Sequence, residues 1–202
     1  MRKIIVLLLT FLLAGCIGNP PREAEIANYD LGSFSGVWTS PGFPIATVEV
    51  KAGAALNSPA QLYRLAYADN LRRRAYTESR WAALPAELME RALQRRIVFG
   101  QADFSGPGCR LQLMLDELEQ RFDSPQTSKA VLEVRAVLLP QQGAALLAKR
   151  AFLIEQPAPS ADARGGVVAT RAALQALADA LAHWLGEVAR ERPQVLAVCQ
   201  DG

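Results

Sequence analysis

The stretch CRLQLMLDELEQRF, residues 109–122, decides the fold because it predicts one long β-strand. Polar and apolar side chains alternate along it, which is typical of a strand with one buried face. The pattern runs first through Leu111, Leu113 and Leu115, and then in the other phase through Leu118, Gln120 and Phe122. The change of phase near Asp116-Glu117 predicts a bulge or a bend.

Two further strand patterns follow this stretch, and each is separated from the last by a turn. The turns are predicted at residues 123–126 and 140–143, and the strands at Ser128–Leu139 and Leu146–Glu155. Strand patterns separated by short turns are typical of hairpins. Residues 109–155 therefore predict an antiparallel meander of three long strands.

Upstream of the meander the same signals predict shorter strands. They lie at Tyr29–Leu31, Ile45–Lys51, Gln61–Tyr67 and Leu71–Tyr76, and the last two form a hairpin around a turn at residues 68–70. Asp69 and Asn70 suit that turn because both residue types tolerate left-handed geometry.

Two segments repeat apolar residues with helical spacing. One runs from about Ala82 or Pro85 to Ile97, with Ser79 as a candidate cap, and Pro is accepted in the first turn of a helix. The other, from Val167 to about Arg190, carries a stripe at Thr170, Leu174, Leu177, Leu181, Trp184, Leu185 and Val188. Pro193 is expected to end it, and Val195–Cys199 to return as a short strand or lie against the sheet.

The predicted fold class is α+β. Two amphipathic helices can each bury a stripe on the same sheet. We therefore expect a two-layer sandwich, in which a mostly antiparallel sheet of about five to seven strands carries two main helices on one face.

The N-terminus has the features of an export signal. A cationic start, Met1–Lys3, precedes an apolar run from Ile4 to Leu13 that is too short to span a bilayer. Leu13-Ala14-Gly15-Cys16 resembles a bacterial lipobox, which implies cleavage before Cys16, three acyl chains such as palmitate on that residue, and a periplasmic location. The alternative is an ordinary signal peptide with an incidental cysteine. By resemblance to the common sorting pattern of such lipoproteins, Ile17 after the cysteine, in place of Asp, implies the outer membrane and not retention at the inner membrane.

These features divide the chain into a signal peptide (residues 1–15), a lipidated N-terminus and spacer (16–23) and a single α+β periplasmic domain (24–202). Removal of residues 1–15 takes away Arg2 and Lys3 and leaves 20 basic and 20 acidic residues. A formally neutral chain lacks the basic footprint of a nucleic-acid-binding protein.

With Cys16 lipidated, Cys109 and Cys199 remain as a pair in an oxidising compartment, and we expect a disulfide between them. The alternative is two buried free thiols.

The sequence offers no residues for a standard catalytic, metal or cofactor site. His183 is the only histidine and lies within a helical pattern, where a structural or surface role is the more common one. Phosphate-binding, dinucleotide-binding and nucleophile-elbow motifs do not occur. Glu117 and Glu119 share a strand face and are expected to be solvated. We expect no enzyme, although a carboxylate-based hydrolase stays an alternative.

Five residues are candidates for binding a partner. Arg72 and Arg74 belong to a run of three arginines that suits an anionic partner, although a solubilising edge strand explains the run as well. Tyr63 and Tyr67 share a strand face that could bind a partner or pack under a helix. Trp81 could form a contact platform or, with Pro85, set the angle at which the helix begins.

Several of these segments together resemble the ABC-type transport auxiliary lipoproteins, the PqiC-like group. The resemblance rests on residues 29–31, 45–50, 63–67 and 76–85, on the strand pair around 111–139 and on the C-terminal helix with His183-Trp184-Leu185. It implies a lipoprotein that works beside an ABC transporter and a periplasmic protein of the mammalian-cell-entry type. Such systems move lipid between the two membranes.

Under this resemblance the protein anchors the outer-membrane end and docks the periplasmic partner without a reaction of its own. Homo-oligomeric rings and direct lipid binding are compatible with it. The main alternative is a lipoprotein that assists envelope assembly or activates a cell-wall synthase. Binding to a mammalian-cell-entry-type protein or to a penicillin-binding protein separates the two.

Overall fold

The protein is described by a computed structural model that covers residues 25–32, 43–97 and 106–201. The predicted signal peptide and the whole of the predicted lipidated N-terminus and spacer, with Cys16, lie outside these residues. In the described part, the strands are β1 (Ala27–Tyr29), β2 (Ile45–Ala52), β3 (Ala60–Leu65), β4 (Arg73–Trp81), β5 (Cys109–Phe122), β6 (Ser128–Pro140) and β7 (Ala148–Pro157). The helices are the 3-10 turn η1 (Ala54–Leu56), α2 (Pro85–Ile97), α3 (Ala163–Glu191) and α4 (Pro193–Asp201).

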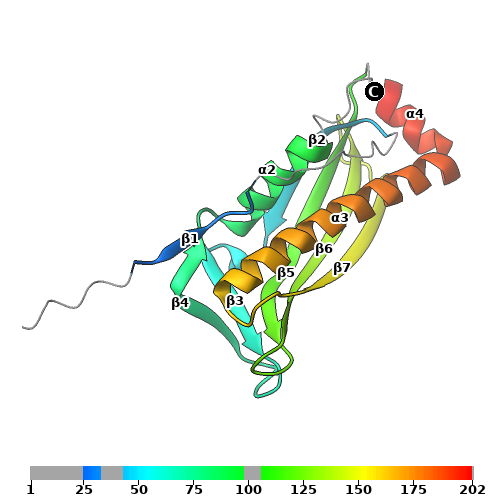
Figure 1. Cartoon of the computed structure of the whole chain (residues 1–202). Coiled ribbons are helices and arrows are strands. Elements are labelled where there is room, and N and C mark those ends of the chain that lie inside the picture. Colours follow the sequence, from blue (N-terminus) through cyan, green and yellow to red (C-terminus); the bar gives the residue numbers. More distant parts are fainter. Residues whose placement is uncertain (1–24, 33–42, 98–105, 202) are drawn as a thin grey trace, which may run out of the picture.

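One sheet contains all seven of these strands, and β5 lies at its centre (Figure 1). One edge of β5 pairs with β6, which pairs with β7, and both pairings are antiparallel. The other edge is shared, because β2 pairs with its first half and β3 with its last three residues, both in parallel. The antiparallel pair β3–β4 and the parallel pair β4–β1 complete the sheet. The predicted meander is confirmed, and the sheet is mixed, with the longest pairings antiparallel.

The predicted bulge in β5 is also confirmed. The register with β6 shifts between Leu115 and Glu117. Leu115 pairs with Val134 and Leu118 pairs with Leu132, and all four side chains are buried. The extra residue thus keeps apolar side chains on the inner face after the phase of the sequence has changed.

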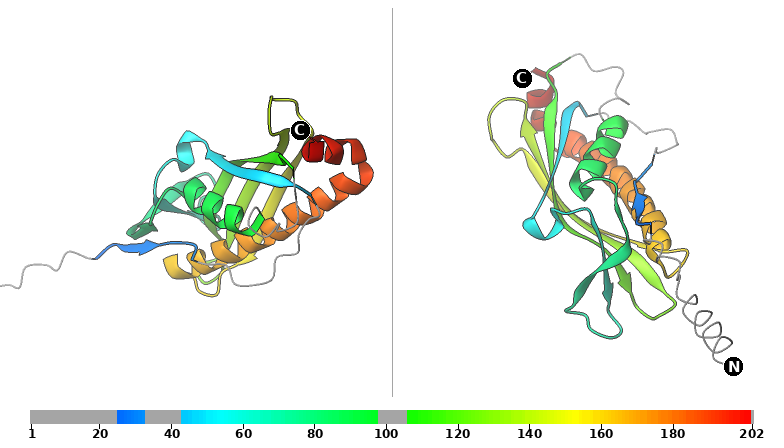
Figure 2. Two further views of the ribbon diagram at one scale, coloured as in Figure 1. Left: turned by 90° about the horizontal axis from the view of Figure 1, so that it is seen from above. Right: turned by 90° about the vertical axis from the view of Figure 1, so that its left-hand side faces the viewer.

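The two long helices cover the same face of the sheet (Figure 2). α2 packs on β2, and α3 packs mainly on β6 and β7. The α3 stripe predicted from the sequence is buried in full, and in α2 the residues Leu88, Ala92, Leu93 and Ile97 are buried. The predicted two-layer α+β fold is therefore confirmed.

α3 begins close to the sheet, at a position that requires small residues. The Asp162 carboxylate caps the helix by accepting a hydrogen bond from the Gly165 amide at 2.7 Å. A Cβ on Gly165 would lie 2.0 Å from the Ser160 carbonyl oxygen, and one on Gly166 would lie 2.1 Å from Oε1 of Gln120. Both distances are far below van der Waals contact, so Gly165 lets the preceding loop fold back on the helix and Gly166 lets the helix approach β5.

The end of the chain differs from its prediction. Residues 193–201 form the helix α4 and not the short strand that was one of the two predicted alternatives. Pro193 is the first residue of α4, where the missing N–H of proline is not needed. The predicted disulfide between Cys109 and Cys199 is present and joins α4 to the start of β5. Gly108, with φ of +69°, makes the turn into β5.

Two further predictions around the β3–β4 hairpin were wrong. Ser79 does not cap a helix, because it lies within β4 and its hydroxyl donates to Gln61 at 2.8 Å. Arg72 lies in the turn before β4 and not in the strand. Among the described residues, no helix combines the length and the apolar character needed to cross a bilayer.

Candidate partner-binding surface

All five residues predicted to bind a partner lie on the β3–β4 hairpin or at its end. The turn that joins the two strands, residues 66–72, is here called the hairpin tip. Tyr67 and Arg72 belong to the tip and are exposed, and Arg74 follows it in β4 and is half-buried. Tyr63 lies in β3, and Trp81 is the last residue of β4. The structure thus brings Tyr67, Arg72 and Arg74 to one end of the sheet.

Hydrogen bonds within the turn fix the shape of the hairpin tip. The amides of Ala68 and Asp69 donate to the Leu65 carbonyl at 3.0 and 2.8 Å. The Asp69 carboxylate accepts from the Leu71 amide at 3.0 Å, and Nη1 of Arg64 donates to the Asn70 carbonyl at 2.8 Å. These bonds satisfy the backbone and leave the Leu71 side chain 92% exposed.

Tyr63 and Trp81 have structural surroundings. The ring of Tyr63 lies 4.6 Å from that of Tyr76 and meets Phe122 edge-on at 6.0 Å, which ties β3 to β4 and β5. Trp81 is 4% exposed and belongs to the core. Its burial removes Trp81 from the candidate contact surface and favours the alternative role at the start of α2.

Next to the hairpin, on the face of the sheet opposite the helices, five charged side chains form a cluster that we call the β5 ion cluster. Its members are Arg64, Arg73, Glu117, Glu119 and Arg121. Nε of Arg64 donates to Oε1 of Glu119 at 2.7 Å, and Nη2 of Arg121 donates to the same oxygen at 3.1 Å. Nη2 of Arg73 lies 2.5 Å from both carboxylate oxygens of Glu117.

Glu119 is the centre of the β5 ion cluster, and its side chain is fully buried. The expectation that Glu117 and Glu119 form a solvated face is therefore wrong for Glu119. Burial alone would raise the pKa of Glu119, but the hydrogen bonds from Arg64 and Arg121 outweigh it and hold that pKa below its usual value. Burial and the neighbouring Glu119 charge instead raise the pKa of Glu117, although Arg73 opposes them.

On the opposite, helix-facing side, a row of neutral polar groups connects the hairpin to α3. Nε2 of Gln61 donates to the Ala163 carbonyl at 2.6 Å, the Tyr76 hydroxyl donates to Oε1 of Gln120 at 2.9 Å, and Nε2 of Gln120 donates to the Ser128 hydroxyl at 2.8 Å. Burial raises the pKa of Tyr76. The cavity beside this row has a volume of about 10 Å³, which suits about one water molecule.

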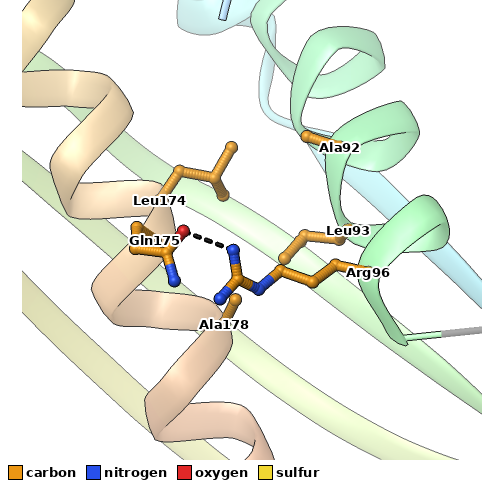
Figure 3. A pocket seen from close by; sticks show the side chains of 6 residues that line it. All are labelled: Ala92, Leu93, Arg96, Leu174, Gln175 and Ala178. Carbon is orange, nitrogen blue, oxygen red and sulfur yellow. Dashed lines mark hydrogen bonds between the residues drawn. The ribbon is translucent and has the colours of Figure 1, made fainter. Parts of the chain in front are cut away.

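A second hollow lies between α2 and α3 and is closed by side chains (Figure 3). Arg96 reaches from α2 towards α3, where it donates a hydrogen bond to Oε1 of Gln175 and lies 3.5 Å from Oδ1 of Asp179. Ala92, Leu93, Leu174 and Ala178 form the remainder of the lining. Neither of these two hollows has room for an acyl chain.

Among the described residues, no three His, Cys, Asp or Glu side chains lie close enough together to hold a metal ion. His183 is exposed on α3, and its Nδ1 lies 3.4 Å from the Glu187 carboxylate one turn further along the helix. This position agrees with the surface role predicted for His183.

Sequence reasoning missed Leu71, Glu119 and the arginines around Glu119. The sequence pattern placed Leu71 at the start of a predicted strand, so nothing in it indicated that this side chain would be exposed in a turn. No signal existed for Glu119 either, because Arg64 and Arg73 come from strands that are 55 and 46 residues away in the sequence.

Comparison with known proteins supplies a family match. The family described as the ABC-type transport auxiliary lipoprotein component matches residues 39–182 of this chain. The matched range begins before β2 and ends within α3, so it spans most of the sheet. No curated protein matches the chain.

Two solved structures share the fold. A crystal structure of a Xanthomonas campestris protein, described by the family model DUF330, has a TM-score of 0.65 and 19% sequence identity, covering 80% of this chain and 97% of that one. A crystal structure described as an uncharacterized protein has a TM-score of 0.54 and 16% identity, covering 83% of this chain and 98% of that one. At these identities the likeness supports the fold alone.

Proposed function

Because the chain belongs to the family of ABC-type transport auxiliary lipoprotein components, we propose that it is the lipid-anchored docking subunit of a lipid transport system. In this proposal Cys16 carries the lipid anchor at the periplasmic face of the outer membrane. The folded domain binds a periplasmic carrier of the mammalian-cell-entry type, which works with an ABC transporter. The domain performs no chemical step of its own.

The family match over residues 39–182 is the observation that carries this proposal. The N-terminal pattern supports it, because a cationic start, a short apolar run and Leu13–Cys16 stand in the order of a lipoprotein signal. One acyl chain binds a membrane only marginally, whereas several chains hold it stably. A triacylated Cys16 would therefore keep the domain at the membrane throughout transport.

The domain also has an exposed end that suits a contact with another surface. The hairpin tip presents exposed apolar, aromatic and cationic side chains there. The β5 ion cluster ties the base of this hairpin to β5 through charge-assisted hydrogen bonds from Arg64 to Glu119 and from Arg73 to Glu117. A rigid base keeps the exposed tip in one orientation.

Co-purification from native membranes tests the proposal. The chain is tagged at its C-terminus, expressed at its natural level, cross-linked in intact cells and isolated in mild detergent. We expect a mammalian-cell-entry-type protein and subunits of an ABC transporter among the proteins recovered. The matched control is Cys16→Ser, which removes the acyl acceptor and should lower the yield of both.

Two outcomes would contradict the proposal. Recovery of a penicillin-binding protein in place of the transport proteins would support the alternative of a cell-wall-synthase activator. Equal recovery of the transport proteins with wild-type chain and with Cys16→Ser would show that the anchor has no part in docking.

A further inference from the structure

The hairpin tip has the composition of a segment that lies at a membrane surface. Leu71 is 92% exposed and Tyr67 is 47% exposed, although the backbone between them is held by hydrogen bonds. A fixed turn therefore holds a large apolar side chain in water. Tyrosine prefers the membrane interface, because its ring is apolar and its hydroxyl is polar.

Two cationic side chains flank Leu71 and Tyr67. Arg72 and Arg74 form no ion pair with any residue in the described part of the chain. Asp69, the one acid of the turn, already accepts a hydrogen bond from the Leu71 amide. Apolar and aromatic residues beside unpaired arginines match the pattern of interfacial segments that bind anionic lipid.

The direction of β1 allows an anchor on Cys16 to reach the same end of the domain. β1 runs parallel to β4 with Ala27 beside Ser79, so following β1 back to its first residue leads in the same direction as following β4 back to the hairpin tip. Leu71 lies eight residues before Ser79, or about 26 Å along the strand. The eleven residues from Cys16 to Ala27 can extend up to about 36 Å, so an anchor on Cys16 reaches the level of the tip.

We propose that the hairpin tip is a second membrane contact, which binds the phospholipid surface that holds Cys16. Leu71 and Tyr67 enter the interface, and Arg72 and Arg74 bind lipid phosphate groups. This inference rests on the lipid anchor of the proposed function. β5 runs from the disulfide to the tip, so the contact would turn the opposite end, with α4 and the β6–β7 turn, towards the periplasm and an approaching carrier.

Site-specific fluorescence tests the proposal on the mature, lipidated chain. Cys16 is acylated and Cys109 is bonded to Cys199, so Leu71→Cys supplies one reactive thiol for an environment-sensitive dye such as NBD. The matched control is Leu146→Cys, since Leu146 is 54% exposed and lies before β7 at the other end of the sheet. The labelled proteins are inserted in vesicles of phosphatidylethanolamine and phosphatidylglycerol.

We expect the dye at residue 71 to shift its emission to the blue, to brighten and to be quenched by lipids with brominated acyl chains, while the dye at residue 146 stays unchanged. Adding Arg72→Glu and Arg74→Glu should reverse the changes at residue 71. Equal responses at both positions, or none at residue 71, would overturn the proposal. So would protection of residue 71 that occurs only when a carrier protein is added.

The outcomes separate this inference from the proposed function. If residue 71 stays in water while Cys16 is acylated and the transport proteins co-purify, the second contact is wrong and the docking function stands. If Cys16 carries no lipid in the native envelope, the proposed function itself fails.

Discussion

Replacing Glu119 with glutamine is expected to lower the free energy of unfolding by about 2–4 kcal/mol. The carboxylate accepts hydrogen bonds from Arg64 and Arg121 in a position without solvent. Glutamine has nearly the same shape, but it cannot neutralise the two guanidinium groups, which would stay largely buried. Both guanidinium groups are partly exposed to water. The expected loss of stability therefore lies at the lower end of the range measured when a buried ion pair is broken. Urea denaturation of both proteins measures it.

Glu133→Gln is the matched control, because Glu133 lies on the neighbouring strand opposite Glu117 and is exposed. An exposed charge of this kind should change stability by no more than about 0.5 kcal/mol. If Glu119→Gln and Glu133→Gln are equally stable, the β5 ion cluster does not hold the hairpin in place.

The difference between wild type and Glu119→Gln should also depend on pH. The folded pKa of Glu119 lies below the unfolded value of about 4.3. Its contribution is thus present at neutral pH and is lost as the pH falls through the folded pKa. Glu117 changes stability with pH in the opposite direction, because its pKa is raised. The stabilities of wild type and Glu119→Gln are therefore best compared when both proteins also carry Glu117→Gln. A difference that stays constant down to pH 3 would contradict this assignment.

Removal of the disulfide has the other large expected effect. Cys109 and Cys199 are 90 residues apart in the sequence, and the chain-entropy relation assigns about 4–5 kcal/mol to the closure of such a loop. The variant that replaces both cysteines with alanine should lose about this amount in urea denaturation. Wild type measured with a reductant provides the control. A loss below about 1 kcal/mol in both would show that α4 is held without the disulfide.

Local patterns in the sequence predicted the elements whose partners are close in the chain. The meander β5–β6–β7 follows from alternation and short turns, and the α3 stripe from Thr170 to Val188 follows from helical spacing. The bulge in β5 was visible as a change of phase at Asp116-Glu117. In each case the side chains that share a face lie within a few residues of one another.

The missed features depend on contacts between distant segments. β2 and β3 both pair in parallel with β5, each along a different part of that strand. No local pattern in either sequence indicates this pairing. In the sequence Glu119 looks like a surface carboxylate, but in the structure it is buried and paired with Arg64 and Arg121. Trp81 looks like a contact residue in the sequence, but it is buried in the core of the folded domain. The tip could be located from Asp69-Asn70, but the exposure of Leu71 follows from the whole arrangement of the turn.

The most direct test of the account is the mass of the N-terminal peptide from protein isolated from its native envelope. The account predicts that the peptide begins at Cys16 and carries the mass of three acyl chains. A peptide that begins elsewhere, or a Cys16 without lipid, would contradict it.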